Sequence, residues 1–270
     1  MDYTLILNFF NKSEELLILQ LKKCEQQTIK PHTIFACFFG PEEKISKLIK
    51  VFKQYTKNWK NTYCIESNFN FMHMGRYQIA LGAPTEYIVM LDDDRFPQPS
   101  YCETMIGIIS KRDCLLAQYG WKLDHSESLK SFQINGTSGS IKGLADMTGQ
   151  FLHSFQNGKS KKASELHEVD YLCGGATFRK ASLRHLFSDS INYHFGCDDI
   201  CFCLRCRKAG IASIVYIPDG EETEKMALHD SGGVNVTVNC LDTILNRSKL
   251  LQSELGMSET FRYQIDNEIK

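Results

Sequence analysis

The sequence predicts an α/β protein whose mostly parallel central sheet carries helices on both faces. About the first hundred residues alternate between short β-forming apolar runs and helical runs, as parallel strands with crossover helices require. The run Tyr87–Leu91 is that of a strand buried on both faces, and Asp92, Asp93 and Asp94 follow it directly. No internal repeat or flexible linker divides the 270 residues, so we expect one domain of two abutting halves.

The composition is that of a soluble globular protein, with 43% hydrophobic and 23% charged residues. A net charge of −1 gives no basic surface for nucleic acid. The apolar runs are much shorter than the ~20 residues of a membrane span, so we expect no transmembrane segment. The N-terminus lacks the pattern of a signal peptide, which predicts a cytoplasmic protein whose eleven cysteines are reduced thiols.

In the first half, residues 1 to 99, local sequence patterns predict each helix and strand. Asn11 stands three residues before Glu14, which is typical of a capping box at a helix start, and Pro41 suits the first turn of a second helix. The helices present apolar stripes at helical spacing, namely Leu17, Leu21 and Cys24 in the first and Ile45, Leu48, Ile49 and Phe52 in the second. A third helix is expected over Gly75–Leu81, and strands over Thr4–Phe10, Thr33–Phe39, Tyr63–Ile65 and Tyr87–Leu91.

The second half, residues 100 to 255, is less regular, and residues 256 to 270 form a tail. Residues 123 to 168 have weak periodicity and much Gly, Ser and Lys, which predicts a substrate loop or lid. The other expected elements are a helix over Met105–Ile109, a strand over Cys114–Tyr119, an extended segment Val169–Phe178 broken by Gly174 and Gly175, a helix over Asp198–Ala209, a strand over Ala212–Ile217 and a helix over Leu241–Leu255.

The three acids after Tyr87–Leu91 are the first functional signal. Unpaired carboxylates are too costly to bury in a core, so these side chains must face water, a cation or both. Ligands of open α/β sheets bind at the carboxyl ends of the strands, and a hard divalent cation that bridges phosphates suits a carboxylate cluster. The acids therefore indicate chemistry on a phosphorylated substrate with Mn²⁺ or Mg²⁺, the alternative being a solvated acidic turn.

Four segments together resemble family 2 glycosyltransferases, whose fold is called GT-A. They occur in the family's order and spacing, and they are Leu5–Lys12, Asp92–Asp94 at the DxD position, Val169–Arg179, and Asp198–Gly210, which is similar to the family's "ED…LRxRKAG" helix. The resemblance implies a metal-dependent enzyme that moves a sugar from a nucleotide-sugar donor, with a UDP-sugar favoured. The acceptor would be a hydroxyl of a glycan, a lipid-linked molecule or a protein.

The resemblance also implies roles for individual residues. Asp94 and Asp92, with His229, would hold the metal ion. Asp199 would be the general base that takes the proton from the acceptor hydroxyl, with Asp198 beside it, and the anomeric configuration would invert. The plainer alternatives are a helix cap for the two acids and an ordinary loop residue for His229.

On the donor side, the nucleotide would contact Phe9, Asn11, Arg76, Asp92 and Asp93. A guanidinium pairs well with phosphate, although Arg76 could instead be a surface arginine. Each of two further positions has two interpretations. Asp170 lines the acceptor pocket or begins a strand, and the pair Gly174–Gly175 allows backbone to approach a sugar or marks a bulge.

The chain departs from the family at two positions. Cys201 stands where the family has a further acid, and the strand that ends at Gly40 lacks the acid that holds the base. Base recognition must therefore differ, and stacking on Phe9, Phe10 or Phe38 is one way to achieve it.

Other classes of function remain in view. A non-catalytic nucleotide-sugar-binding homologue would share every motif, and a metal-dependent phosphatase would use Asp92 and Asp94 but lacks a small hydroxyl or β-branched residue at Arg95–Pro97. A sugar nucleotidyltransferase would need a glycine-rich loop where Phe9–Lys12 stands. A zinc module is the fourth class, but the spacing of its possible ligands indicates buried thiols, these being Cys197, Cys201, Cys203 and Cys206.

Overall fold

The structure is a computed structural model. It describes residues 1–9, 12–69, 71, 74–123, 149–153, 165–172, 174–187 and 198–217. Several sequence predictions concern residues outside these ranges and stay predictions. They are Phe10, Asn11, Cys197, His229, the helix over Leu241–Leu255, the tail, and most of the loop 123 to 168.

Eight strands form the central sheet, in the order β3-β2-β1-β4-β10-β5-β11-β8. The pairs among β1, β2, β3 and β4 are parallel, as is β5 with β11, whereas β10 and β8 run antiparallel to their neighbours. This is the mostly parallel α/β sheet that the sequence predicts. The strands are β1 (Tyr3–Phe9), β2 (Thr33–Phe39), β3 (Thr62–Ser67), β4 (Tyr87–Asp92), β5 (Cys114–Ala117), β8 (Glu165–Val169), β10 (Gly175–Arg179) and β11 (Ala212–Ile217).

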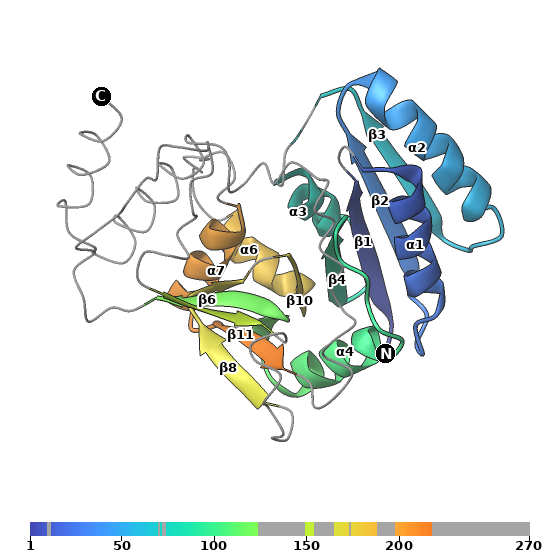
Figure 1. Ribbon diagram of the computed structural model, residues 1–270. Coiled ribbons are helices and arrows are strands. Elements are labelled where there is room, and N and C mark those ends of the chain that lie inside the picture. The colour runs from blue at the N-terminus through green and yellow to red at the C-terminus, as the bar shows by residue number, and fades with distance from the viewer. Residues whose placement is uncertain are drawn as a thin grey trace, which may run out of the picture.

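Helices cover both faces of the sheet, and each face has its own apolar core (Figure 1). One core contains side chains from α1 (Glu14–Glu25), α2 (Glu42–Tyr55) and α4 (Tyr101–Lys111). The other contains side chains from α3 (Met74–Leu81), α6 (Leu183–Leu186) and α7 (Asp198–Lys208). The stripes predicted for α1 and α2 are confirmed, because all seven of their side chains are buried.

The middle of β4 carries the predicted two-sided burial. Ile88, Val89, Met90 and Leu91 are all buried between β1 and β10. Each such side chain contributes about 1.5–3 kcal/mol relative to leaving it in water. The burial fixes the register of β4, and the register places Asp92 at the exact end of the strand, opposite Asn8 of β1.

The start of α1 differs from the prediction. The helix begins at Glu14, and Ser13 is its N-cap, with its hydroxyl accepting a hydrogen bond from the backbone N–H of Leu16. The N-cap is therefore Ser13 and not the position that the sequence pattern predicted. A serine cap contributes about 1 kcal/mol, and the choice of Ser13 leaves Lys12 outside the helix, where its ammonium reaches the acidic cluster described below.

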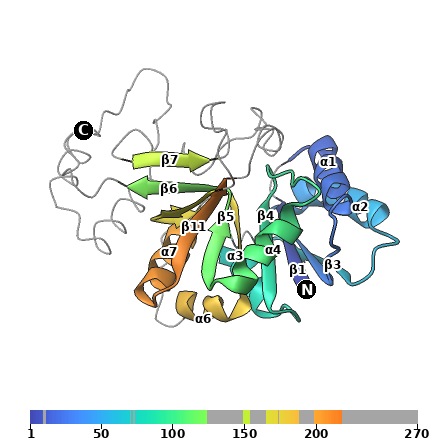
Figure 2. The same ribbon diagram turned by 90° about the horizontal axis from the view of Figure 1, so that it is seen from below.

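Two predictions for the second half were wrong in detail. The expected strand Cys114–Tyr119 is two strands in different sheets, because the chain bends at Gln118 between β5 and β6 (Tyr119–Leu123). The segment 123 to 168 is not all loop, since it contains β7 (Gly149–His153) and most of β8. A three-stranded sheet forms there in the order β7-β6-β9, where β9 is Tyr171–Leu172, and Figure 2 shows β6 and β7 side by side.

Candidate active site at the carboxyl ends of the strands

The carboxyl ends of β1, β2, β3 and β4 share one edge of the sheet, because the four strands are parallel neighbours. At this edge the chain turns sharply after Asp92, and the N–H of Arg95 donates to the carbonyl oxygen of Asp92. The buried side chain of Gln20 on α1 supports the turn, since its Nε2 donates to the carbonyls of Asp92 (2.7 Å) and Arg95 (2.8 Å). A helix on one face of the sheet thus holds the acidic turn in place.

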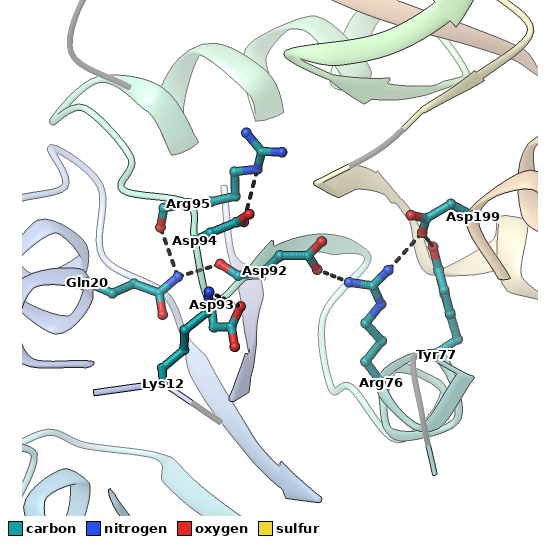
Figure 3. A network of polar contacts seen from close by, with 9 residues as sticks. All are labelled: Lys12, Gln20, Arg76, Tyr77, Asp92, Asp93, Asp94, Arg95 and Asp199. Atoms are coloured by element: carbon teal, nitrogen blue, oxygen red, sulfur yellow. Dashed lines mark hydrogen bonds and ion pairs between the residues drawn. The ribbon is translucent and has the colours of Figure 1, made fainter. Parts of the chain in front are cut away.

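The three consecutive aspartates point to three different cations (Figure 3). Asp92 forms an ion pair with Arg76 of α3, and the ammonium of Lys12 lies 3.7 Å from Oδ1 of Asp93. Nε of Arg95 lies 3.3 Å from Oδ1 of Asp94. The charge of each carboxylate is therefore balanced locally, and the cations come from three separate parts of the chain.

Arg76 is the centre of the site. Its side chain is fully buried, with 0% of the residue exposed. One guanidinium nitrogen, Nη1, pairs with Asp92, and the other, Nη2, lies 2.7 Å from Oδ1 of Asp199 at the start of α7. The sequence alternative of a surface arginine is wrong. A guanidinium presents several donors in a fixed plane, so one buried Arg76 can hold two carboxylates from the two halves of the chain.

Tyr77 supports the same arrangement and was not singled out from the sequence. Its hydroxyl donates to Oδ1 of Asp199 at 2.8 Å, so this oxygen accepts from both Arg76 and Tyr77. The buried ring of Tyr77 packs edge-on against Phe202 of α7 and near Phe178 of β10, with centroid distances of 5.1 and 6.3 Å. Nothing in the sequence distinguishes this tyrosine from an ordinary core aromatic on α3.

Lys12, Gln20 and Arg95 were likewise not predicted as site residues. Arg95 follows the acids directly, which is the only signal that could have indicated it. Its guanidinium packs over the ring of Tyr119 at 4.0 Å. It also fills the space beside Gly174, whose φ is +76° and where a Cβ would lie 2.3 Å from Arg95 Nε. Gly174 therefore makes room for Arg95 in this structure.

Phe9 does not lie as expected for a nucleotide contact. Its ring is buried and stacks on Phe38, with centroids 5.0 Å apart and planes at 22°, and Phe52 closes the cluster at 6.3 Å. A base cannot stack on a ring that is already enclosed by α2 and β2. The expectation of stacking on Phe9 or Phe38 is therefore corrected. The sequence could not show this, because helices cover both faces of β1 and β2 and the sequence does not say which rings those helices enclose.

Asp170 is also not positioned as a residue that lines an acceptor pocket would be. The residue is buried and forms an ion pair with Arg207 of α7. This pair fastens α7 to the junction between β8 and β9, and so it helps to fix Asp199 at the other end of the same helix. Asp198 is the first residue of α7, but the structure does not describe its side chain. His229 also lies outside the described residues.

The described cysteines behave as small core residues. Cys201, Cys203 and Cys206 are buried thiols, and burial raises the pKa of Cys206 well above its ordinary value. Within the described ranges no group of three or more His, Cys, Asp or Glu side chains is placed to hold a metal ion. The three cysteines are buried, as the sequence predicts, while Cys197 lies outside those ranges.

A divalent ion at the acidic turn has partial support from the side chains themselves. Oδ1 of Asp94 is buried and makes no hydrogen bond within the described part of the chain, and its contact with Arg95 is an ion pair only. Such an oxygen suits a cation. Asp92 fits less well, because its carboxylate turns toward Arg76 and away from Asp94 (Figure 3).

Comparisons with known proteins find a similarity among solved structures. No family model matches the chain, and no curated protein matches it. Among solved structures, the chain is similar to the crystal structure of S. aureus TarS 1-349, with 12% sequence identity and a TM-score of 0.49. The match covers 81% of this chain and 60% of that one, so this chain spans less than two thirds of the other's length. A likeness of this degree assigns no activity.

In the part of the chain that the structure describes, no helix is both long enough and apolar enough to cross a membrane.

Proposed function

We propose that the chain is a glycosyltransferase that moves a sugar from a nucleotide-sugar donor to an acceptor hydroxyl. The observation that carries the proposal is the buried Arg76, which joins Asp92 at the end of β4 to Asp199 at the start of α7. These are the two acidic positions that the family resemblance marks as donor site and general base. They are 107 residues apart in the chain (199 − 92), and one side chain brings them together.

Asp199 has the surroundings of a general base. It lies in the first turn of α7, where backbone N–H groups favour an anionic side chain. Two donors on the same oxygen, from Arg76 and Tyr77, fix the direction of the carboxylate. In the proposed reaction the carboxylate takes the hydroxyl proton while the hydroxyl oxygen bonds to the anomeric carbon. The bond from that carbon to the nucleotide diphosphate breaks on the opposite side, so the configuration inverts.

The acidic turn would hold the diphosphate end of the donor. Asp94 would be the main ligand of a Mn²⁺ or Mg²⁺ ion, with Asp92 and His229 as the further ligands that the family resemblance implies. Such an ion neutralises the charge of the departing diphosphate. Lys12 and Arg95 already lie beside the acids and supply positive charge to the same region. Arg76 is buried between two carboxylates, so we assign it to positioning rather than to contact with the nucleotide.

A thermal-shift screen tests this proposal. UDP, GDP, CMP and their sugars are each added with Mn²⁺ and, separately, with EDTA. A ligand that binds the native state raises the melting temperature by mass action. We expect a rise with one or more nucleotides that needs the metal and disappears in Asp94→Ala. Asp113→Ala, an acid on the surface far from the turn, is the matched control and should keep the rise.

The screen, extended to phosphate mimics, separates the alternatives when it is combined with assays of sugar transfer, donor hydrolysis and bound zinc. No shift with any nucleotide contradicts the transferase proposal. A nucleotide-dependent shift without transfer or donor hydrolysis identifies a non-catalytic binding homologue. A shift with phosphate mimics alone supports the phosphatase, although a nucleophilic Asp92 would have to leave its ion pair with Arg76. Stoichiometric zinc in the purified protein would support the zinc module.

A further inference from the structure

Two exposed phenylalanines lie on the connection between β3 and α3. Phe69 is 64% exposed and Phe71 is 42% exposed. Among the phenylalanine side chains that the structure describes, only these two are exposed. Leaving two neighbouring aromatic rings in water is unfavourable, and contiguous apolar surface of this kind often marks a binding site.

The two rings are anchored and form a corner. Their centroids are 5.0 Å apart and their planes meet at 75°. Phe71 also meets the buried ring of Phe39 at the end of β2, with centroids 5.4 Å apart at 71°. The first turn of α3 presses on both, because a Cβ at Gly75 would lie 2.6 Å from the Phe39 ring and from Cβ of Phe71. The corner is therefore held by the core and not by solvent-exposed side chains alone.

The corner lies beside the acidic turn. β2 and β3 end at the same edge of the sheet as β1 and β4. Gly75 contacts Phe39 and Phe71, and the next residue, Arg76, reaches Asp92. The N-terminal turn of α3 thus touches the aromatic corner with one residue and the acidic turn with the next.

Two backbone N–H groups at this corner are hydrogen-bonded within the protein. The N–H of Gly40 donates to the carbonyl of Ser67 at 3.0 Å, and the N–H of Phe69 donates to Oγ of Ser67 at 3.1 Å. The end of β2, Phe38–Gly40, offers no acidic or amide side chain to a ligand. Beyond the end of the neighbouring β3, the exposed rings of Phe69 and Phe71 offer ring surface.

We propose that Phe69 and Phe71 stack against the base of the nucleotide donor. This inference rests on the proposed function and adds the base-binding residues to it. Stacking on an aromatic ring is tolerant of base identity, because every base has a π-face. The site would therefore discriminate only weakly between uracil, cytosine and guanine, since ring contact and not a hydrogen-bond pattern holds the base. This replaces the expected stacking on Phe9 and Phe38, whose rings are enclosed.

The test is isothermal titration of UDP, CDP, GDP and pyrophosphate in the presence of Mn²⁺. The wild type should bind the three nucleotides with similar affinity. Phe69→Ala and Phe71→Ala should each weaken all three about tenfold, as loss of one stacked ring does. Pyrophosphate, which has no base, should bind equally well to all variants. Phe69→Tyr, which keeps the ring, should bind as the wild type does.

Tyr63→Ala is the matched control. Tyr63 is another exposed aromatic of β3 at 53%, but it lies near the opposite end of the strand, against Phe35. Its removal should leave nucleotide binding unchanged. Phe69 is mostly exposed, so Phe69→Ala should fold normally, and a melting curve checks this for each variant.

The outcomes distinguish this inference from the proposed function. Equal nucleotide binding by the wild type and by the two alanine variants overturns the stacking and leaves the transferase proposal intact. A strong preference for one base that survives both substitutions overturns it too, because a hydrogen-bond pattern elsewhere must then read the base. If pyrophosphate and nucleotides all fail to bind the wild type, donor binding itself is contradicted, and the stacking inference falls with it.

Discussion

The two carboxylates that Arg76 joins are held in different ways. Asp92 belongs to a run of three acids, each of which faces a different cation. Asp199 stands at a helix start, and one of its oxygens accepts from Arg76 and from Tyr77. The contacts of Lys12 with Asp93 and of Arg95 with Asp94 are longer, at 3.7 and 3.3 Å, than the 2.7 Å contact between Arg76 and Asp199.

This difference suggests a division of roles. Longer ion pairs are weaker than short charge-assisted hydrogen bonds, so a metal ion can replace Lys12 and Arg95 as the partner of Asp93 and Asp94. The two cations are then available to pair with a diphosphate. Asp199 is fixed by two short bonds from buried side chains, which suits a group that must meet a proton in one orientation. Asp93 and Asp94 are thus suited to an exchange of partners, whereas Asp199 is held in one orientation, as is Asp92 by its close contact with Arg76.

The largest expected effect comes from breaking the bridge itself. Arg76→Met removes the guanidinium that pairs with both Asp92 and Asp199 and leaves two partly buried carboxylates without this partner. Loss of one partner of a buried ion pair costs about 3–5 kcal/mol. We expect the free energy of unfolding in urea to fall by that amount and the nucleotide-induced thermal shift to disappear.

Lys53→Met is the matched control for this variant. Lys53 pairs with Glu66 on the surface, and both side chains are about half exposed. Its loss should cost less than about 1 kcal/mol. Equal stability of Arg76→Met and the wild type would show that the bridge does not hold the two halves together.

The next largest effect is expected from a variant that changes Asp199 alone. In Asp199→Asn the amide oxygen can still accept from Arg76 and Tyr77, so the fold should persist. The variant cannot take up a proton as a carboxylate does, and loss of a general base typically lowers the rate 10²–10⁴-fold. We expect kcat for sugar transfer to fall by roughly that factor while nucleotide binding stays at the wild-type level. Retention of wild-type kcat would remove Asp199 from the role of base.

A smaller effect is expected from Tyr77→Phe, which alters the orientation of the Asp199 carboxylate but keeps the carboxylate itself. Tyr77→Phe removes a single hydroxyl from Asp199 and keeps the packing of the ring. We expect a loss of about 1 kcal/mol in unfolding free energy and a fall of kcat by up to about tenfold with KM unchanged, because 1.4 kcal/mol in a barrier corresponds to a factor of ten.

Tyr3→Phe makes the same chemical change elsewhere, since the Tyr3 hydroxyl donates to the carbonyl of Ile29. It should lower stability to a similar extent and leave kcat unaltered. If both variants lose activity equally, the Tyr77 hydroxyl acts through stability and not through Asp199.

The two halves of the chain that Arg76 joins were also unequally predictable from the sequence. β1 to β4 and α1 to α3 follow from local patterns, because each parallel strand is followed by the helix that covers it. The antiparallel β10 lies between β4 and β5, and its partners on β4 are more than eighty residues away. No local pattern predicts that pairing. The separation of β5 from β6 at Gln118 and the strands inside 123 to 168 were missed for the same reason.

The site shows the same limit at the level of side chains. The family resemblance indicated Arg76, Asp92 and Asp199, but each for a separate role. Their meeting depends on how α3 and α7 pack on the sheet, and Arg76 and Asp199 are 123 residues apart. The packing of α2 on the sheet also determines which aromatic side chains are buried. Phe9 and Phe38 are enclosed by α2, whereas Phe69 and Phe71 lie beyond the end of β3, and their composition alone does not distinguish the two pairs.

The smallest effect uses buried thiols to compare the surroundings of Arg76 with a core region that lacks this cation. Burial raises the pKa of Cys37 to about 12, although the nearby Arg76 guanidinium acts in the opposite direction. Burial also raises the pKa of Cys102 to about 12, with no such cation among its causes. In the unfolded chain both thiols would ionise near their ordinary value of 9.0.

Between those two values each of these thiols is protonated in the folded chain and ionised in the unfolded chain. The contribution of the two thiols to the unfolding free energy should therefore be constant well below pH 9 and should fall as the pH rises toward 12. Urea unfolding at pH 8, 9.5 and 10.5 measures this slope. Cys102→Ala and Cys37→Ala should each reduce the slope, because each removes one thiol that ionises only on unfolding. In the Arg76→Met background the contribution of Cys37 should grow, since the cation that favours its thiolate is gone, while that of Cys102 should not change. An equal response of both thiols would show that the field of Arg76 does not extend to β2.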